Sequence, residues 1–112
     1  MNIYVKTYNE IKGFHYWENA PAEVEFLKNR HRHTFHIITY FEVSGTDREI
    51  EIIMMERAID KYLYTKYGKE SARECEFNDM SCEMIAKEIV ETFNAVKCEV
   101  NEDGKGGAIV VR

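Results

Sequence analysis

Residues 30–43 read Arg30-His31-Arg32-His33-Thr34-Phe35-His36-Ile37-Ile38-Thr39-Tyr40-Phe41-Glu42-Val43. β-Branched and aromatic residues dominate from position 33 onward, which is typical of a β-strand. Side chains two residues apart on a strand point to the same face, so His31 and His33 can present two imidazoles to one point in space. His36 falls on the opposite face, where a packing or surface role is expected.

A third imidazole would complete a metal site. All four histidines of the chain lie between positions 15 and 36, and His15 is the one that remains. Three histidine ligands leave a coordination position open, which distinguishes a reactive zinc site from a structural one. His15, His31 and His33 are therefore the candidate ligands of one metal ion. The alternative is a pair of exposed histidines at the start of a strand.

The bulk properties narrow the class of protein. A chain of 112 residues is long enough for one domain, residues 1–112, and too short for two. The net charge of −5 disfavours a nucleic-acid partner. No signal peptide is visible, and no apolar run reaches the roughly 18–20 residues of a membrane span. Three cysteines without a CxxC pair favour a reducing compartment, so we expect a cytoplasmic protein.

The remaining elements are predicted from hydrophobic periodicity. They are strands over residues 2–8, 96–102 and 108–111 and helices over residues 51–67 and 81–93. Residues 69–80 are polar and charged, so an exposed connection is expected there. This order predicts an α+β fold with a four-stranded antiparallel sheet and both helices on one face.

Three motifs in the chain follow the order found in a known family. Phe14-His15 and His31-Arg32-His33-Thr34-Phe35 look like a zinc motif of the form F-x-A-A-H followed by H-G-H-N-Y. The stretch Met80-Ser81-Cys82-Glu83-Met84-Ile85-Ala86 looks like P-T-S-E-N-L-A, and Cys98-Glu99-Val100-Asn101-Glu102-Asp103 looks like V-x-V-x-E-T. With the element order, these motifs resemble the 6-pyruvoyl-tetrahydropterin synthase family, which includes the bacterial 6-carboxy-tetrahydropterin synthases.

The resemblance implies a fold, a cofactor and a ligand. The fold would be the tunnel fold (ββααββ), in which a homo-oligomer, a trimer or hexamer, joins its sheets into a closed β-barrel. Zinc would be held by His15, His31 and His33. Glu102 would anchor the amidine edge of a pterin or purine-like ring, because one carboxylate can accept two parallel N–H bonds from such an edge.

The chain departs from the family pattern where the family transfers protons. The position of the family's catalytic cysteine is Leu27, and no histidine follows His36 to form the usual Asp–His pair. A general base must reach the proton that it removes. Glu25, or its neighbour Glu23, is the candidate replacement for the cysteine, and Glu70 is the candidate for the second role.

Arg30 and Arg32 flank the first histidine of the strand. Two arginines at this place either lie in solvent or bind an anionic group of the ligand, since guanidinium groups suit phosphates and carboxylates.

The resemblance suggests two functions, and a third hypothesis is independent of the resemblance. The first is zinc-dependent lyase chemistry on dihydroneopterin triphosphate or a relative. The second is a catalytically silent protein that sequesters a pterin- or nucleotide-like small molecule. The third is a purely structural or interaction protein, which leaves the placement of the histidines unexplained.

Overall fold

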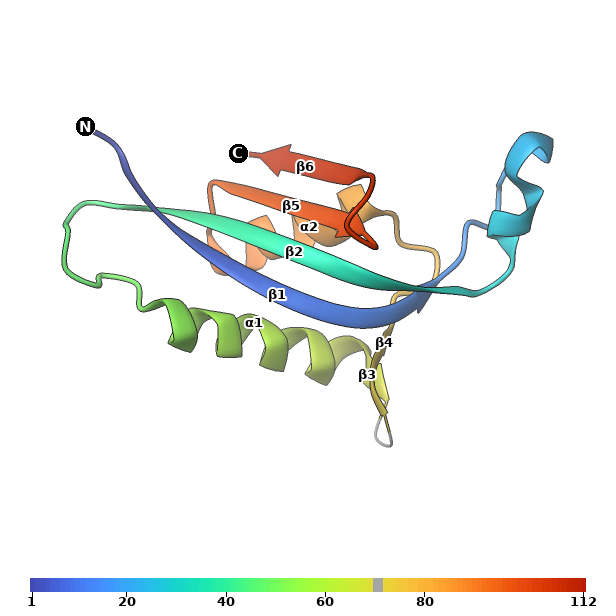
Figure 1. Ribbon diagram of the computed structural model, residues 1–112, viewed down its shortest axis with the longest axis horizontal. Helices are drawn as coiled ribbons and strands as arrows, with labels where there is room; N and C mark the ends of the chain where they lie inside the picture. The colour runs from blue at the N-terminus through green and yellow to red at the C-terminus, as the bar shows by residue number, and fades with distance from the viewer. Residues whose placement is uncertain (70–71) are drawn as a thin grey trace.

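The structure is a computed structural model that describes residues 1–69 and 72–112. Its elements are β1 (Ile3–His15), the 3₁₀ helix η1 (Ala22–Lys28), β2 (His31–Val43), α1 (Ile52–Tyr67), β3 (Gly68–Lys69), β4 (Ala72–Glu76), α2 (Cys82–Phe93), β5 (Lys97–Glu102) and β6 (Gly107–Val111). The six strands form one sheet in the order β3-β4-β1-β2-β5-β6 (Figure 1).

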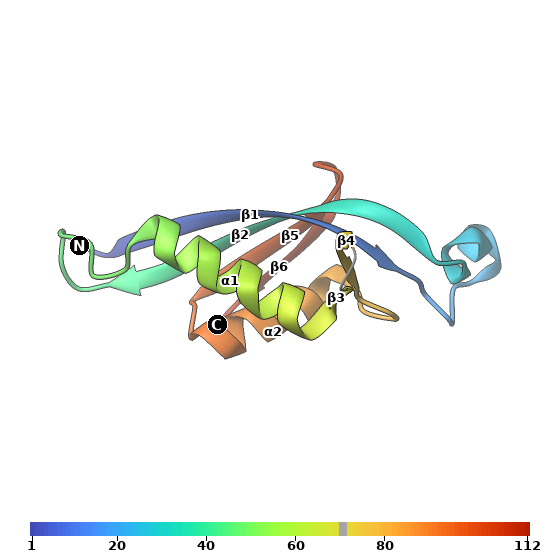
Figure 2. The same ribbon diagram turned by 90° about the horizontal axis from the view of Figure 1, so that it is seen from below.

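The centre of the sheet is a long antiparallel pair. β1 and β2 have 13 residues each and pair from Ile3↔Val43 to His15↔His31. Buried and more exposed positions alternate along both strands, as expected for a sheet with one covered face. Figure 2 shows that α1 and α2 both lie on the same side of the sheet.

The hydrophobic core fills the space between the sheet and these two helices. β2 contributes Phe35 and Ile37, α1 contributes Ile59, and α2 contributes Ile85 and Ile89; each is at most 1% exposed. Burying one such side chain stabilises the fold by about 1.5–3 kcal/mol relative to leaving it exposed. The core therefore holds β2 in place, and with it the histidines at its first residues.

Both α-helices begin at a side-chain cap. Glu51 accepts hydrogen bonds from the backbone N–H groups of Ile53 and Met54 at the start of α1. Ser81 accepts one from the N–H of Met84 at the start of α2, as serine commonly does at the N-cap of a helix. The cap at Ser81 fixes the first turn of α2 beside the histidines.

The predicted four-stranded antiparallel sheet with two helices is wrong. The sheet has six strands and is mixed, because β4 pairs with β1 in parallel at Gly13↔Cys75 and Phe14↔Glu76. A third helix, η1, lies between β1 and β2. The overall class is α+β.

The error arises in residues 69–80, which were expected to be an exposed connection. Buried and charged residues alternate within this polar stretch, as in a strand with one covered face. Cys75 and Phe77 are fully buried. Glu76 and Glu74 point the other way and form ion pairs with Arg30 and Arg32. Two apolar residues among many charges are too weak a pattern to predict a strand.

The predicted closed barrel is also wrong, since the sheet of this chain is open, with β3 and β6 at its edges. The edge of β1 that faces away from β2 is already used within the chain. β4 pairs with its end, and the N–H of Tyr8 donates to Glu56 of α1 at 2.9 Å. The side chain of Asn9 donates to the Glu56 carbonyl at 2.9 Å and to Asp60 at 2.7 Å. Among the residues described, no helix combines the length and the apolar character that crossing a membrane requires.

One carboxylate, Glu88 of α2, ties the two helices together. It accepts hydrogen bonds from the hydroxyls of Tyr62 and Tyr67 at 2.8 and 2.7 Å and from Lys66 Nζ at 3.0 Å, all on α1. Burial raises the pKa of Glu88, but the three donors outweigh it, so the pKa lies below its usual value of 4.5. A depressed carboxyl pKa stabilises the folded state above the unfolded pKa, and this stability is lost as the pH falls through the folded pKa.

We expect Glu88→Gln to lower the free energy of unfolding at neutral pH by about 1–3 kcal/mol, because it removes charge-assisted hydrogen bonds. We also expect the variant to lose less stability than the wild type on acidification below pH ~4.5, where the native carboxylate becomes protonated. Urea denaturation from neutral pH to about pH 3 measures both effects. Glu91→Gln, an exposed position on the same helix, is the matched control. Parallel pH profiles for wild type and Glu88→Gln would contradict the assignment.

Candidate metal centre

The pairing of β1 with β2 brings the three predicted histidines together. His15 ends β1 and lies opposite His31, and His33 lies opposite Gly13 two residues further along. One ligand nitrogen from each imidazole lies within 4.8 Å of the other two. The group could therefore hold a metal ion.

The three rings are arranged around a common point rather than stacked. The ring centroid of His15 lies 4.5 Å from that of His31 and 5.1 Å from that of His33. The centroids of His31 and His33 are 5.0 Å apart. The interplanar angles are 68°, 82° and 83°. The three rings thus meet edge to face in every pair, and none is stacked on another.

Each imidazole is oriented by a hydrogen bond from its Nδ1 atom. The acceptors are the Met80 carbonyl for His15 at 2.9 Å, the Asn29 carbonyl for His31 at 2.8 Å and the Asp103 carboxylate for His33 at 2.6 Å. A carbonyl or carboxylate can only accept, so Nδ1 carries the proton in all three rings. In a neutral imidazole the lone pair then remains on Nε2, the atom available to a metal.

Glu102, the last residue of β5, lies beside these nitrogens. Its Oε2 atom is 3.0 Å from His15 Nε2 and 3.7 Å from His33 Nε2. His15 is 8% exposed, and its buried Nε2 lacks a partner with hydrogen-bond geometry among the described residues. Such an orphaned polar atom is rare and points to a missing partner such as an ion.

The carboxylate and the imidazole shift each other's pKa. Burial lowers the pKa of His15, but the nearby Glu102 carboxylate and the Met80 carbonyl raise it more, and the net effect is upward. The pKa of Glu102 is lowered, chiefly by its contact with His15, although burial opposes this. The surroundings of His15 therefore favour a positive charge at this imidazole, from a proton or from a metal cation.

An aromatic side chain supports the centre from the core side. Phe35 of β2 is fully buried, and its ring meets those of His15 and His33 edge to face, with centroids 5.3 and 5.7 Å apart. Phe77, after β4, packs against Phe35 at 5.2 Å. The imidazoles thus rest on the hydrophobic core, which limits their movement.

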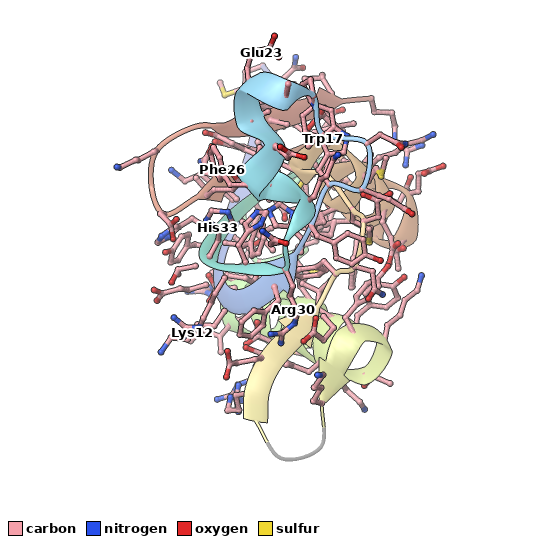
Figure 3. The ribbon with its side chains drawn as sticks, turned by 90° about the vertical axis from the view of Figure 1, so that its right-hand side faces the viewer. Lys12, Trp17, Glu23, Phe26, Arg30 and His33 are labelled. Atoms are coloured by element: carbon pink, nitrogen blue, oxygen red, sulfur yellow. The ribbon has the colours of Figure 1, made fainter. Side chains whose placement is uncertain are left out.

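A cavity of about 540 Å³ adjoins the histidines. Residues from the end of β1 and the loop after it, from η1, from the start of β2, from the first turn of α2 and the loop before it, and from the β5–β6 hairpin line the cavity. They are His15, Tyr16, Trp17, Asn19, Leu27, His31, Asp79, Met80, Ser81, Cys82, Glu83, Met84, Glu102 and Gly107. Figure 3 looks at the molecule from the η1 end and shows Trp17 and Phe26 around the outer end of the site. The volume suits a small organic ligand.

No protein-family model matches the chain, and no curated protein matches it. The geometry of the site therefore carries the functional argument, and the resemblance to the 6-pyruvoyl-tetrahydropterin synthase family stays a prediction.

The two predicted arginines lie away from the cavity. Arg30 donates from Nε to Glu76 at 2.9 Å and covers the ring of Phe14, while Arg32 Nε lies 3.1 Å from Glu74. In the view of Figure 3, Arg30 lies below His33 and Trp17 lies above it. Strand alternation explains the placement of Arg32, because it lies between His31 and His33 and so projects from the opposite face of β2.

The two predicted proton-transfer residues are not brought to the histidines. Glu25 lies on η1 with 71% of its side chain exposed, 3.7 Å from Lys28, and it does not line the cavity. Glu70 lies outside the described residues. The acidic residues that do line the cavity are Asp79, Glu83 and Glu102.

Sequence reasoning missed the groups that orient the imidazoles. Met80 and Asn29 act through backbone carbonyls, for which no side-chain signal exists. Asp103 had a signal, because it directly follows Glu102 and opens the turn between β5 and β6. The sequence also contains no indication that Trp17 lines the cavity.

Proposed function

We propose that the protein is a zinc-binding, 6-pyruvoyl-tetrahydropterin synthase-like protein that acts on a pterin- or purine-type small molecule. The observation that carries the proposal is that one ligand nitrogen of each imidazole lies within 4.8 Å of the other two, while the three Nδ1 hydrogen bonds leave Nε2 as the available ligand atom. Imidazole nitrogen is a preferred ligand of zinc, and three such ligands leave room for a ligand oxygen. Zinc bound there would polarise that oxygen and acidify its proton.

The lining of the cavity supports a flat, nitrogen-rich ligand. Trp17 and Leu27 supply apolar surface, and Glu83 and Glu102 supply carboxylates that accept N–H bonds. Within the described part of the chain, no lysine or arginine lines this cavity, and Arg30 is engaged by Glu76. These charges favour an unphosphorylated ring over a triphosphate, since a phosphate would lack cationic partners apart from the metal.

Glu102 is the residue that we propose to grip the ring. Its carboxylate reaches both the histidines and the cavity, so it can accept two N–H bonds from an amidine edge beside the metal. Its lowered pKa keeps it ionised at neutral pH, as this contact requires.

We expect purified wild-type protein to contain about one zinc ion per chain by plasma mass spectrometry and to bind dihydroneopterin more tightly than its triphosphate by calorimetry. Glu102→Gln should weaken dihydroneopterin binding by at least about tenfold, the effect of losing one charge-assisted bond of roughly 1.5–3 kcal/mol. Glu99→Gln on the same strand is the matched control, because Glu99 bonds to Asn101 and does not line the cavity. Equal dihydroneopterin affinity in Glu102→Gln and wild type would remove Glu102 from the ligand site.

A second function, ligand sequestration without turnover, is favoured by the state of the candidate acid–base groups. Burial, together with nearby carboxylates, raises the pKa of the cavity cysteine Cys82 to about 12, so its thiol is a poor base. Glu25, the expected replacement for a catalytic cysteine, is exposed on η1. Zinc-loaded protein that binds dihydroneopterin and returns it unchanged would establish the silent binder over the lyase.

We further propose that the protein works in the cytoplasm as a homo-oligomer. Its three cysteines are all free and buried, which supports a reducing compartment. Native mass spectrometry measures the number of subunits and the metal content together.

A further inference from the structure

We infer that Asp103 is a positioning residue of the metal centre: its carboxylate holds the His33 imidazole in the tautomer that leaves Nε2 free for the metal. The inference rests on the proposed metal function. The juxtaposition that supports it is the contact of 2.6 Å between His33 Nδ1 and Asp103 Oδ2.

The two carboxylate oxygens of Asp103 have separate partners. Oδ2 accepts from His33 Nδ1, and Oδ1 accepts from the backbone N–H of Thr34 at 2.9 Å. The N–H of Asp103 in turn donates to the Thr34 carbonyl at 2.8 Å. Three bonds to consecutive residues of β2 fix the carboxylate against the strand that carries His33.

The turn between β5 and β6 places Asp103 for this contact. Its φ of 56° lies in the left-handed region, which Asp and Asn tolerate better than most residues. Glu102 N donates to the Gly106 carbonyl at 2.8 Å, and Lys105 N donates to the Glu102 carbonyl at 2.9 Å. The turn is thus closed independently of the Asp103 side chain.

His33 differs from its two companions in the nature of its partner. His15 and His31 donate to backbone carbonyls, which any residue at position 80 or 29 would supply. His33 donates to a charged side chain, and a carboxylate there both selects the tautomer and increases the basicity of the metal-binding nitrogen. The affinity of the whole site for its metal is therefore sensitive to position 103.

Two substitutions separate this role from a purely structural one. Glycine accepts positive φ without strain, so Asp103→Gly removes the carboxylate and spares the turn. Asp103→Asn keeps the shape and the Oδ1 bond to the Thr34 N–H, which turns the amide NH₂ toward His33. That NH₂ can only donate, so it forces the proton of His33 onto Nε2 and blocks the metal-binding atom.

The experiment measures zinc affinity by chelator competition for wild type, Asp103→Gly and Asp103→Asn, with thermal unfolding followed by circular dichroism. We expect a loss of about 10- to 100-fold for glycine and a larger loss for asparagine. Nitrogen-15 correlation spectra of the metal-free proteins should show His33 protonated on Nδ1 in wild type and on Nε2 in Asp103→Asn. Asp47→Asn, an exposed aspartate paired with Arg48, is the matched control and should change neither readout.

A structural role predicts the opposite order, with asparagine milder than glycine. That order, or zinc affinity equal to wild type in both variants, would overturn the inference and leave the metal function intact. The same holds if His33 keeps its Nδ1 proton in Asp103→Asn. Wild-type protein that takes up no zinc would overturn both the metal function and the inference that rests on it.

Discussion

His15→Ala should lose zinc almost completely, with an affinity reduced about a thousandfold. One of three imidazoles contributes roughly a quarter to a third of a zinc binding free energy of about 10–16 kcal/mol, and about 1.4 kcal/mol corresponds to tenfold. His15 is the ligand with the most buried and least satisfied Nε2, so its removal also relieves an orphaned polar atom. The metal-free variant should consequently fold as well as the metal-free wild type.

The matched control for this prediction is His36→Ala. His36 belongs to the same strand as His31 and His33, but it stacks on Tyr8 on the other face of the sheet, and the Tyr8 hydroxyl bonds to its Nδ1. It should retain full zinc content by plasma mass spectrometry. Zinc should raise the melting temperature of wild type and His36→Ala and leave that of His15→Ala unchanged, because only a ligand of the native state stabilises it. A stoichiometric zinc ion in His15→Ala would contradict the three-histidine centre.

Phe35→Ala should produce the largest loss of fold stability, about 3–5 kcal/mol in the free energy of unfolding. Phe35 is fully buried, and it packs on Phe77 and under His15 and His33. The cavity left behind removes dispersion contacts on both sides, toward the core and toward the imidazoles. We therefore also expect weaker zinc binding, since two ligands lose the surface on which they rest.

Urea denaturation of the metal-free protein measures the stability term, and chelator competition measures the zinc term. Phe26→Ala is the matched control, since it makes the same substitution at a phenylalanine of η1 that is 68% exposed. It should change the free energy of unfolding by less than about 0.5 kcal/mol. If Phe35→Ala unfolded at the same urea concentration as wild type, the placement of Phe35 in the core would be wrong.

The parts of the fold that the sequence predicts are those in which local pattern and burial agree. Strand alternation after position 33 and the helical spacing of Ile59, Ile85 and Ile89 both reflect one face packed on the core. β4 could not be found in this way, because its partner is a parallel strand distant in sequence and only Cys75 and Phe77 mark its inner face. Residues 22–28 have no regular period, and η1 forms there as a short 3₁₀ turn rather than a periodic element.

The residues of the candidate site likewise divide into those that local pattern predicts and those that depend on contacts between distant segments. The spacing of His31 and His33 places them on one face through strand geometry alone, whereas the proximity of His15 depends on the register of β1 against β2. The arginines were unpredictable because their partners, Glu74 and Glu76, lie on the strand that the sequence did not reveal. Nothing local to Glu102 shows that its carboxylate approaches two imidazoles.

The register His15↔His31 also limits how the gene for this chain can change length. A single-codon insertion or deletion inside β2 would exchange inward and outward positions beyond it, and the strand would then present Arg32 where an imidazole belongs. The segment between the two strands, which includes η1, has no inward–outward alternation that a change of one residue would reverse. Length polymorphism among orthologues is therefore expected in the mostly exposed stretch 21–26, between the cavity-lining residues Asn19 and Leu27, and single-residue changes of length are expected to be absent from 31 to 43.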